Sequence, residues 1–218
     1  MVRNIEALGG HLFVIRHPES GMPAQLAEIL SPSTHIINAG DGHNQHPTQA
    51  LTDLFTLKKE WGDGSWSNRC VTLIGDLKHS RVAHSLVDGL LMLNIGEIHL
   101  AAPEALSYTE VTDPRIKVFS SLTPALTNSD MIMTFRLQKE RLPTEQLPYY
   151  SEICEQFILT AEKLKKAKPM ALVMHPGPIN RGIEITSEVA DSQQSLILKQ
   201  VKNGVAVRMA ALELLNLN

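Results

Sequence analysis

The sequence predicts an α/β protein with two lobes, each built on a doubly wound parallel sheet, and the first lobe is short of strands. Short apolar runs of strand length alternate with segments of helical spacing, which is the pattern of βαβ units. Polar clusters follow several of these runs, as expected for loops at the carboxyl ends of parallel strands. The chain has 218 residues and is 43% hydrophobic, which is sufficient for a substantial core.

The strands are predicted from apolar runs that turn residues separate. These runs lie at residues 11–16, 70–75, 97–101, 117–120, 131–135 and 170–174. Because helical segments lie between them, we expect crossover connections and parallel pairing.

Three longer helices are predicted. Residues 47–61 begin with Pro47, which suits a first helical turn, and continue with apolar residues at core spacing. Residues 81–94 follow Ser80, whose hydroxyl suits an N-cap. Residues 193–215 form a long helix interrupted only by a glycine. Its apolar stripe consists of Leu196, Ile197, Val201, Val205, Met209 and Leu212.

Composition and charge exclude several classes of protein. With 20 Lys and Arg against 23 Asp and Glu, the chain has no broad positive field for a nucleic-acid backbone or an anionic membrane. Cys70 and Cys154 lie far apart, so neither a disulfide framework nor a thiolate metal site is indicated. No secretory leader and no apolar run of about 20 residues is found. We therefore expect a cytoplasmic protein.

The first polar cluster, residues 38–49, is a glycine-containing loop that leads from a strand into the helix at Pro47. His46 and Gln49 are three residues apart and can share one face of the helix start. A histidine and an amide at this position can polarise a carbonyl oxygen and stabilise the charge of a tetrahedral transition state. The alternative is a histidine that only caps the helix.

The second cluster, residues 75–81, ends with Arg81 in the first turn of a helix. A cation there opposes the helix dipole, whereas a bound carboxylate is favoured by both the arginine and the free N–H groups. This conflict points to an anionic ligand. The alternative is a surface pair between Arg81 and Asp76.

Three further segments add candidate ligands. Arg136 and Gln138 alternate with apolar residues and point to one side, which suits a carboxylate clamp. The loop at residues 175–182 contains two prolines and two glycines and can present backbone carbonyls, although any tight turn has this composition. Arg16 ends the first strand and suits either a phosphate or a surface ion pair.

Taken in order, these segments resemble aspartate carbamoyltransferase over nearly the whole chain. The motifs are residues 38–42 (Asn-Ala-Gly-Asp-Gly), 46–51 (His-Pro-Thr-Gln-Ala-Leu), 75–81 (Gly-Asp-Leu-Lys-His-Ser-Arg), 136–141 (Arg-Leu-Gln-Lys-Glu-Arg) and 175–182 (His-Pro-Gly-Pro-Ile-Asn-Arg-Gly). Ornithine carbamoyltransferase resembles the chain less, because its later motif is a cysteine-containing His-Cys-Leu-Pro. The resemblance implies a carbamoyltransferase-like fold with a truncated first lobe.

The resemblance implies transfer of a carbamoyl group from carbamoyl phosphate to L-aspartate in pyrimidine biosynthesis, without a cofactor or metal. The implied carbamoyl-phosphate residues are Arg16, His46, Gln49 and Gly177, with His46 and Gln49 catalytic. The implied aspartate residues are Arg81, Arg136 and Gln138, with backbone contacts from Pro176 and Gly177. The family forms trimers, so a homo-oligomer is expected, and a full-length homologue or a regulatory chain is a further expected partner.

The implied domains are a remnant of the carbamoyl-phosphate domain at 1–46, a bridging helix at 47–61, an aspartate domain at 62–192 and a returning helix at 193–218. The glycine-rich and serine-rich stretch at residues 60–68 is where the second domain begins. The family's Ser-x-Arg-Thr-Arg phosphate loop and its Ser and Lys loop do not occur in the sequence. We therefore expect very weak or absent transfer by this chain alone. The alternatives are a catalytically silent binding or assembly subunit and transfer to another amino acid.

Overall fold

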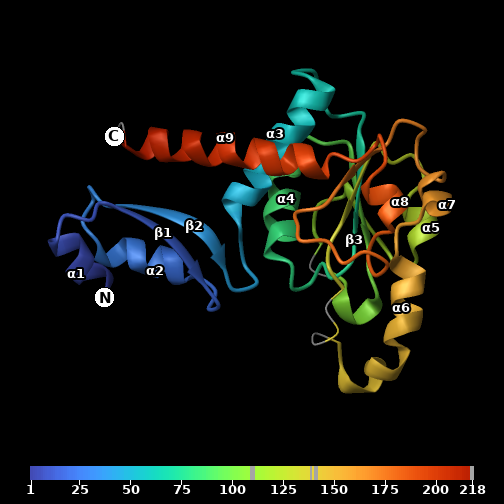
Figure 1. Cartoon of the computed structure of the whole chain (residues 1–218), viewed down its shortest axis with the longest axis horizontal. Coiled ribbons are helices and arrows are strands. Elements are labelled where there is room, and N and C mark those ends of the chain that lie inside the picture. The colour runs from blue at the N-terminus through green and yellow to red at the C-terminus, as the bar shows by residue number, and fades with distance from the viewer. Residues whose placement is uncertain (109–110, 138, 140–141, 217–218) are drawn as a thin grey trace.

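Two parallel sheets of unequal size form the framework of the chain in the computed structural model, which describes residues 1–108, 111–137, 139 and 142–216 (Figure 1). The smaller sheet has the strand order β1-β2 and the larger has the order β5-β4-β3-β6-β7. All neighbouring strands in both sheets pair in parallel. The predicted α/β class with two lobes and parallel sheets is therefore confirmed.

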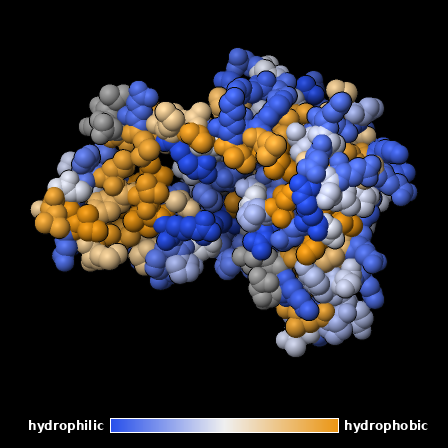
Figure 2. Space-filling model, in the orientation of Figure 1, coloured by the Kyte–Doolittle hydropathy of each residue, from blue (hydrophilic) through white to orange (hydrophobic). Residues whose placement is uncertain are grey.

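The small lobe contains the two-stranded sheet. Its elements are α1 (Val2–Ala7), β1 (Leu12–His17), α2 (Met22–Ile29) and β2 (His35–Asp41). Phe13 and Leu30 are buried here, whereas Val14 is 61% exposed. Apolar residues consequently gather on the surface of this lobe, as Figure 2 shows on the left of the view. This lobe has much less internal packing than the rest of the chain.

The large lobe begins at β3 and contains the five-stranded sheet. Its elements are β3 (Cys70–Ile74), α4 (Arg81–Met92), β4 (Glu97–Ala101), η1 (Glu104–Leu106), β5 (Ile116–Phe119), α5 (Leu122–Ala125), β6 (Met131–Thr134), η3 (Thr144–Tyr149), α6 (Tyr150–Phe157), α7 (Ala161–Leu164), β7 (Leu172–Met174) and α8 (Ser187–Ala190).

Both faces of the large sheet are covered. Side chains alternate between the two faces of a strand, so Val71 and Leu73 of β3 belong to the core on the α4 side. Ile74 belongs to the core on the opposite side, which α5, α6, α7 and α8 cover. All five residues of β3 are buried. Burial on both faces explains why these strands read as continuous apolar runs rather than as an alternating pattern.

Two long helices connect the lobes. Helix α3 (Pro47–Trp61) leads from the small sheet to the large one, and α9 (Ile197–Asn216) lies across it (Figure 1). Polar pairs join the two helices: Nδ2 of Asn203 donates to Oγ1 of Thr56 at 3.0 Å, and Nζ of Lys199 lies 2.6 Å from Oε1 of Glu60. In the described residues, neither α9 nor any other helix is both long and apolar enough to cross a membrane.

The predicted elements agree with the structure to within two residues for all six predicted strands, and α3 has the predicted bounds. Two expectations were wrong in detail. Residues 38–41 belong to β2 rather than to a loop, because they continue the pairing with β1. Helix α9 begins at Ile197 rather than at residue 193, because the preceding residues run along β7, where the amide of Val173 donates to the carbonyl of Gln194.

From Val201 onward, the predicted apolar stripe faces outward, whereas Leu196 at its start is buried. Val201, Val205 and Met209 are 67%, 61% and 63% exposed, whereas Gln200 and Asn203 are buried. The face of α9 that contacts α3 is therefore polar. This arrangement is the reverse of the usual amphipathic surface helix.

Candidate active site

A cavity of about 390 Å³ lies at the carboxyl ends of the strands of the large sheet. Arg81, Arg136, Pro176 and Gly177 line it, together with residues of the segment that follows β2. The four predicted ligands come from segments that follow β3, β6 and β7. Because parallel strands end at one edge of their sheet, these segments converge although they are up to 96 positions apart in the sequence (177 − 81).

Arg81 lies in the first turn of α4, behind Ser80, whose Oγ accepts from the amide of Ala83 as predicted for an N-cap. Its Nη1 donates to the carbonyl oxygen of Gly42 at 3.2 Å, which joins the large lobe to the end of β2. Gly40 has a φ of +119°, and a Cβ there would lie 2.7 Å from Cζ of Arg81. A side chain at residue 40 therefore cannot coexist with this position of the guanidinium.

Arg136 follows β6 directly, and its side chain is exposed. It lines the same cavity as Arg81, so two guanidinium groups face one space of small-molecule size. Gln138, the third predicted carboxylate ligand, lies outside the described residues. Two arginines and the N-terminus of α4 together favour a ligand with more than one negative charge.

Hydrogen bonds to His175 and Gln200 hold the loop at residues 175–178 in place. The amide of Gly177 donates to Nδ1 of His175 at 2.8 Å, and the amide of His175 donates to Oε1 of Gln200 at 3.0 Å. His175 is buried, and its Nε2 lies 3.2 Å from Oε1 of the buried Glu184. The peptide bond between Gly177 and Pro178 is cis. These contacts fix the Pro176 and Gly177 segment at the wall of the cavity.

His46 lies at the N-cap of α3, where its amide donates to Oγ of Ser85 at 2.9 Å. Burial, and then the positive charges of Arg81, Arg208 and Arg16, lower the pKa of His46 to about 4. The imidazole is therefore neutral at physiological pH. A neutral ring can still donate one N–H to an oxygen that gains charge, and it does not require a counter-ion.

Arg16 and His46 line a second cavity of about 340 Å³, which Arg208 of α9 also lines. The predicted residues therefore fall into two groups. Arg81 and Arg136, predicted for the carboxylates, lie in the first cavity, and Arg16 and His46, predicted for carbamoyl phosphate, lie in the second, between the small lobe, α3 and α9. Gly177, which was also predicted for carbamoyl phosphate, lines the first cavity instead.

Gln49 belongs to a network that the sequence did not reveal. Its Nε2 donates to Oδ1 of Asp53 at 3.0 Å, and its Oε1 accepts from Nη2 of Arg208 at 3.2 Å. Nε2 of Gln200 donates to the same oxygen of Asp53 at 2.8 Å. Burial raises the pKa of Asp53 to about 7, although both glutamine bonds and Arg208 act to lower it. The i to i+4 spacing of Gln49 and Asp53 was the one local signal for this network.

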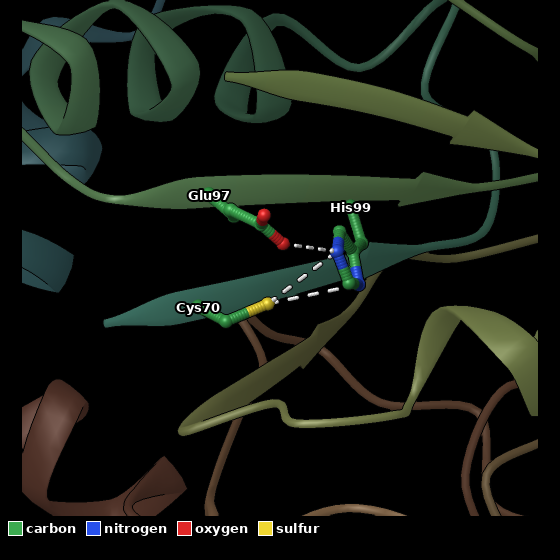
Figure 3. A group of neighbouring side chains, drawn as sticks. All are labelled: Cys70, Glu97 and His99. Carbon is green, nitrogen blue, oxygen red and sulfur yellow. Dashed lines mark hydrogen bonds and ion pairs between the residues drawn. The ribbon is translucent and has the colours of Figure 1, made fainter. Parts of the chain in front are cut away.

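A second cluster of titratable side chains lies at the opposite end of the large sheet, where Cys70 and Glu97 are register partners at the starts of β3 and β4 (Figure 3). Nδ1 of His99 donates to the carbonyl oxygen of Ala125 at 2.7 Å, and its Nε2 lies 3.0 Å from Oε2 of Glu97. Burial, and then Glu97 and Asp130, raise the pKa of the Cys70 thiol to about 11.

The arrangement of this cluster does not suit a metal ion. Sγ of Cys70 lies 3.6 Å from both ring nitrogens of His99. An ion bound at one ring nitrogen lies in the ring plane, along the lone pair of that nitrogen. A sulfur equidistant from the two nitrogens lies off that line, beyond bonding distance of the ion. We assign the cluster a packing role.

Comparisons with known proteins agree with the site. Residues 67–215 match the family model of the aspartate/ornithine carbamoyltransferase Asp/Orn binding domain, and residues 1–59 match that of the carbamoyl-P binding domain. The aspartate carbamoyltransferase catalytic subunit of Coxiella burnetii (strain Dugway 5J108-111) is 51% identical over 213 residues, which are 98% of this chain and 67% of the relative. The chain thus spans about two thirds of the length of this relative.

Solved structures give the same result. Aspartate transcarbamoylase from Trypanosoma cruzi in complex with carbamoyl aspartate and phosphate superposes with a TM-score of 0.83 at 32% identity, covering 97% of this chain and 67% of that one. The complex of the same enzyme with N-(phosphonacetyl)-L-aspartic acid gives a TM-score of 0.81 at 30% identity, with coverages of 97% and 67%. The chain therefore belongs to the aspartate/ornithine carbamoyltransferase family, and the relatives named above are aspartate carbamoyltransferases.

Proposed function

We propose that the chain transfers the carbamoyl group of carbamoyl phosphate to the amine of L-aspartate, giving N-carbamoyl-L-aspartate and phosphate. The observation that carries this proposal is the convergence of Arg81 and Arg136 on one cavity with the loop at Pro176 and Gly177. Two guanidinium groups suit the two carboxylates of aspartate, since each can bind a carboxylate through paired N–H donors. Gln138 is proposed as a third ligand of aspartate.

The carbamoyl phosphate is proposed to lie against Arg16, His46, Gln49 and Gly177. Arg16 binds the phosphate, and the neutral imidazole of His46 donates to the carbamoyl oxygen. Gln49 and the carbonyls of Pro176 and Gly177 accept amide or amine hydrogens. The presence of Arg16 and His46 in one cavity and the low pKa of His46 support these roles.

In the proposed reaction, the uncharged amine of aspartate attacks the carbamoyl carbon. A carbon–nitrogen bond forms, the carbonyl oxygen gains charge in the tetrahedral intermediate, and His46 stabilises that oxygen. The bond to the phosphate oxygen then breaks, and phosphate leaves with the electron pair and takes up the proton that the amine loses. Orientation of the two substrates and the fixed donors supply most of the acceleration.

We propose the following division of the chain. Residues 1–46 contribute to carbamoyl-phosphate binding, 47–61 bridge the lobes, 62–192 bind aspartate, and 193–218 return toward the first lobe. Helix α3 and the position of α9 across it support this division. We also propose a cytoplasmic homo-oligomer that acts in pyrimidine biosynthesis, and the outward apolar residues of β1 and α9 support association with further chains.

We propose that transfer by these 218 residues alone is slow, because Arg16 projects from a weakly packed two-stranded lobe and is exposed. The same observation favours a second candidate function, namely a binding or assembly subunit that holds the dicarboxylate but depends on another chain for the phosphate.

The test combines two measurements on the purified chain. Calorimetry with N-(phosphonacetyl)-L-aspartic acid measures binding, and formation of carbamoyl aspartate measures turnover. Arg81→Ala should weaken binding about 10- to 100-fold, which corresponds to the loss of one charge-assisted interaction. Arg115→Ala is the matched control, since Arg115 pairs with Asp113 outside both cavities. Binding without turnover indicates the binding subunit, and no binding by the unmodified chain contradicts both functions.

A further inference from the structure

Asp53 lies at the centre of the contacts between α3, α9 and the loop at residues 175–178. Its side chain is 0% exposed, and no sequence motif singled it out. One carboxylate oxygen, Oδ1, accepts from both Gln49 and Gln200. A single buried group therefore orients two glutamines: Gln49 of its own helix, α3, and Gln200 of α9, which is 147 positions from Asp53 in the sequence.

The first glutamine reaches the proposed carbamoyl side of the site. An amide group can be turned either way, and its direction is set by its hydrogen-bond partners. Nε2 of Gln49 donates to Asp53, so Oε1 is the end that turns away from Asp53, toward Arg208. That direction presents an acceptor, which is what the N–H groups of a carbamoyl amide require.

The second glutamine extends the network to the loop. Nε2 of Gln200 donates to Asp53, so its Oε1 is available to accept from the amide of His175 at 3.0 Å. His175 in turn accepts from the amide of Gly177. The orientation of Gln200 thus determines how the backbone at Pro176 and Gly177 is held.

We propose that Asp53 is a positioning residue that sets, through Gln49 and Gln200, the two groups of acceptors that receive the hydrogens of the carbamoyl amide. This inference rests on the proposed function. Asp53 itself does not touch the substrates, since it is buried beneath the two glutamines. Its carboxylate keeps both amides in the one orientation in which their oxygens, rather than their N–H groups, face the site and its loop.

The environment of Asp53 agrees with a role other than packing. Its second oxygen, Oδ2, is buried without a hydrogen-bond partner among the described residues. An unpartnered carboxylate oxygen is costly, and burial accordingly raises the pKa of the group. A residue selected only for stability would be an amide or an apolar side chain at this position, since either avoids the buried charge.

The experiment compares Asp53→Ala with Asp53→Asn by steady-state kinetics and by calorimetry with carbamoyl phosphate. Asp53→Ala should raise the KM or Kd for carbamoyl phosphate about 10- to 100-fold, as expected when two hydrogen bonds to a charged group are lost. The KM for aspartate should change much less. Asp53→Asn keeps an oxygen acceptor and should restore most of the affinity.

Asp130→Asn is the matched control. Asp130 is also a buried carboxylate, but it pairs with Arg69 and Lys168 at the far end of the sheet. This variant should lose stability without a change in the affinity for carbamoyl phosphate. If Asp53→Ala behaves in the same way, Asp53 only packs and the inference is wrong.

A second variant covers the case in which Asp53→Ala does not fold. Gln200→Met keeps a similar volume and removes both hydrogen bonds of the glutamine, so it should weaken carbamoyl phosphate binding in the same direction. Unchanged affinity in Gln200→Met contradicts the inference. Measurements on the unmodified chain distinguish failure of the proposed function from failure of the role of Asp53. If the unmodified chain binds neither carbamoyl phosphate nor N-(phosphonacetyl)-L-aspartic acid, the proposed function is wrong.

Discussion

The two lobes have the same kind of sheet and differ in what holds it together. In the large lobe, β3 is buried along its whole length, between two apolar cores. In the small lobe, β1 has one buried residue, Phe13, and an outward Val14. The proposed ligands of aspartate thus project from a well-packed framework, whereas Arg16 projects from a lobe with little core of its own. This difference predicts that the packed core of the large lobe holds the ligands of aspartate in place, whereas the small lobe does not hold Arg16 in the same way.

The largest expected effect is a loss of unfolding free energy when a side chain is truncated in the core of the large lobe. Phe157, at the end of α6, is 2% exposed and packs in the large core. Phe157→Ala should lower the free energy of unfolding by about 3–5 kcal/mol, since it removes buried contacts and leaves a cavity. Val14→Ala in the small lobe should change it by less than about 0.5 kcal/mol. Urea denaturation followed by circular dichroism measures both values, and equal losses would contradict the comparison.

The next largest effect is the pH dependence of stability that Asp53 causes in the contacts between α3 and α9. The folded-state pKa of Asp53 is about 7, above the ordinary unfolded value near 4, so the folded chain holds a proton that the unfolded chain has lost between about pH 4 and pH 7. The contribution of Asp53 to stability should therefore fall as the pH rises through this window and level off above it. Asp53→Asn removes this dependence. Its free energy of unfolding at pH 8 should therefore be larger than that of the unmodified chain by up to about 4 kcal/mol.

The measurement is the difference in unfolding free energy between Asp53→Asn and the unmodified chain at pH 4.5, 6 and 8. Asp88→Asn, a matched change at an exposed position of α4, should show no such trend. A difference that stays constant with pH would mean that Asp53 is already ionised throughout the range.

A smaller effect is expected on the binding affinities for aspartate and for phosphate. Arg81→Ala should weaken the binding of aspartate, and Arg16→Ala that of phosphate, each by about 10-fold or more. Calorimetry with each ligand on each variant gives four values. If either arginine affects both ligands equally, the two cavities do not act as separate sites.

The smallest effect is electrostatic. Arg208 is one of three arginines that lower the pKa of His46, after the larger contribution of burial. Arg208→Met should therefore raise the pKa of His46 from about 4, while burial still keeps it below its ordinary value. Proton NMR of the imidazole as a function of pH measures this shift. Arg181→Met is the control, because Arg181 pairs with Asp191 instead, and an equal shift there would contradict the assignment.

The large lobe was predictable because burial on both faces gives continuous apolar runs, and the polar clusters follow those runs directly. The half-buried residues of β2 give no such run, so the extent of that strand was missed. The apolar stripe of α9 indicated a helix but not that Gln200 and Asn203 would form its buried face. Asp53 could not be recognised as a centre of contacts, because Gln200 approaches it only through tertiary packing.

The polar inner face of α9 has a consequence for how this helix comes away from the rest of the chain. Hydrogen bonds are directional, so sliding α9 along α3 by one turn would break the pairs of Gln200 and Asn203 together. Each such bond adds only about 1 kcal/mol net, and the mostly exposed apolar face adds little burial within this chain. Backbone amides in the second half of α9 should therefore exchange with solvent deuterium by local opening, long before the sheet of the large lobe unfolds.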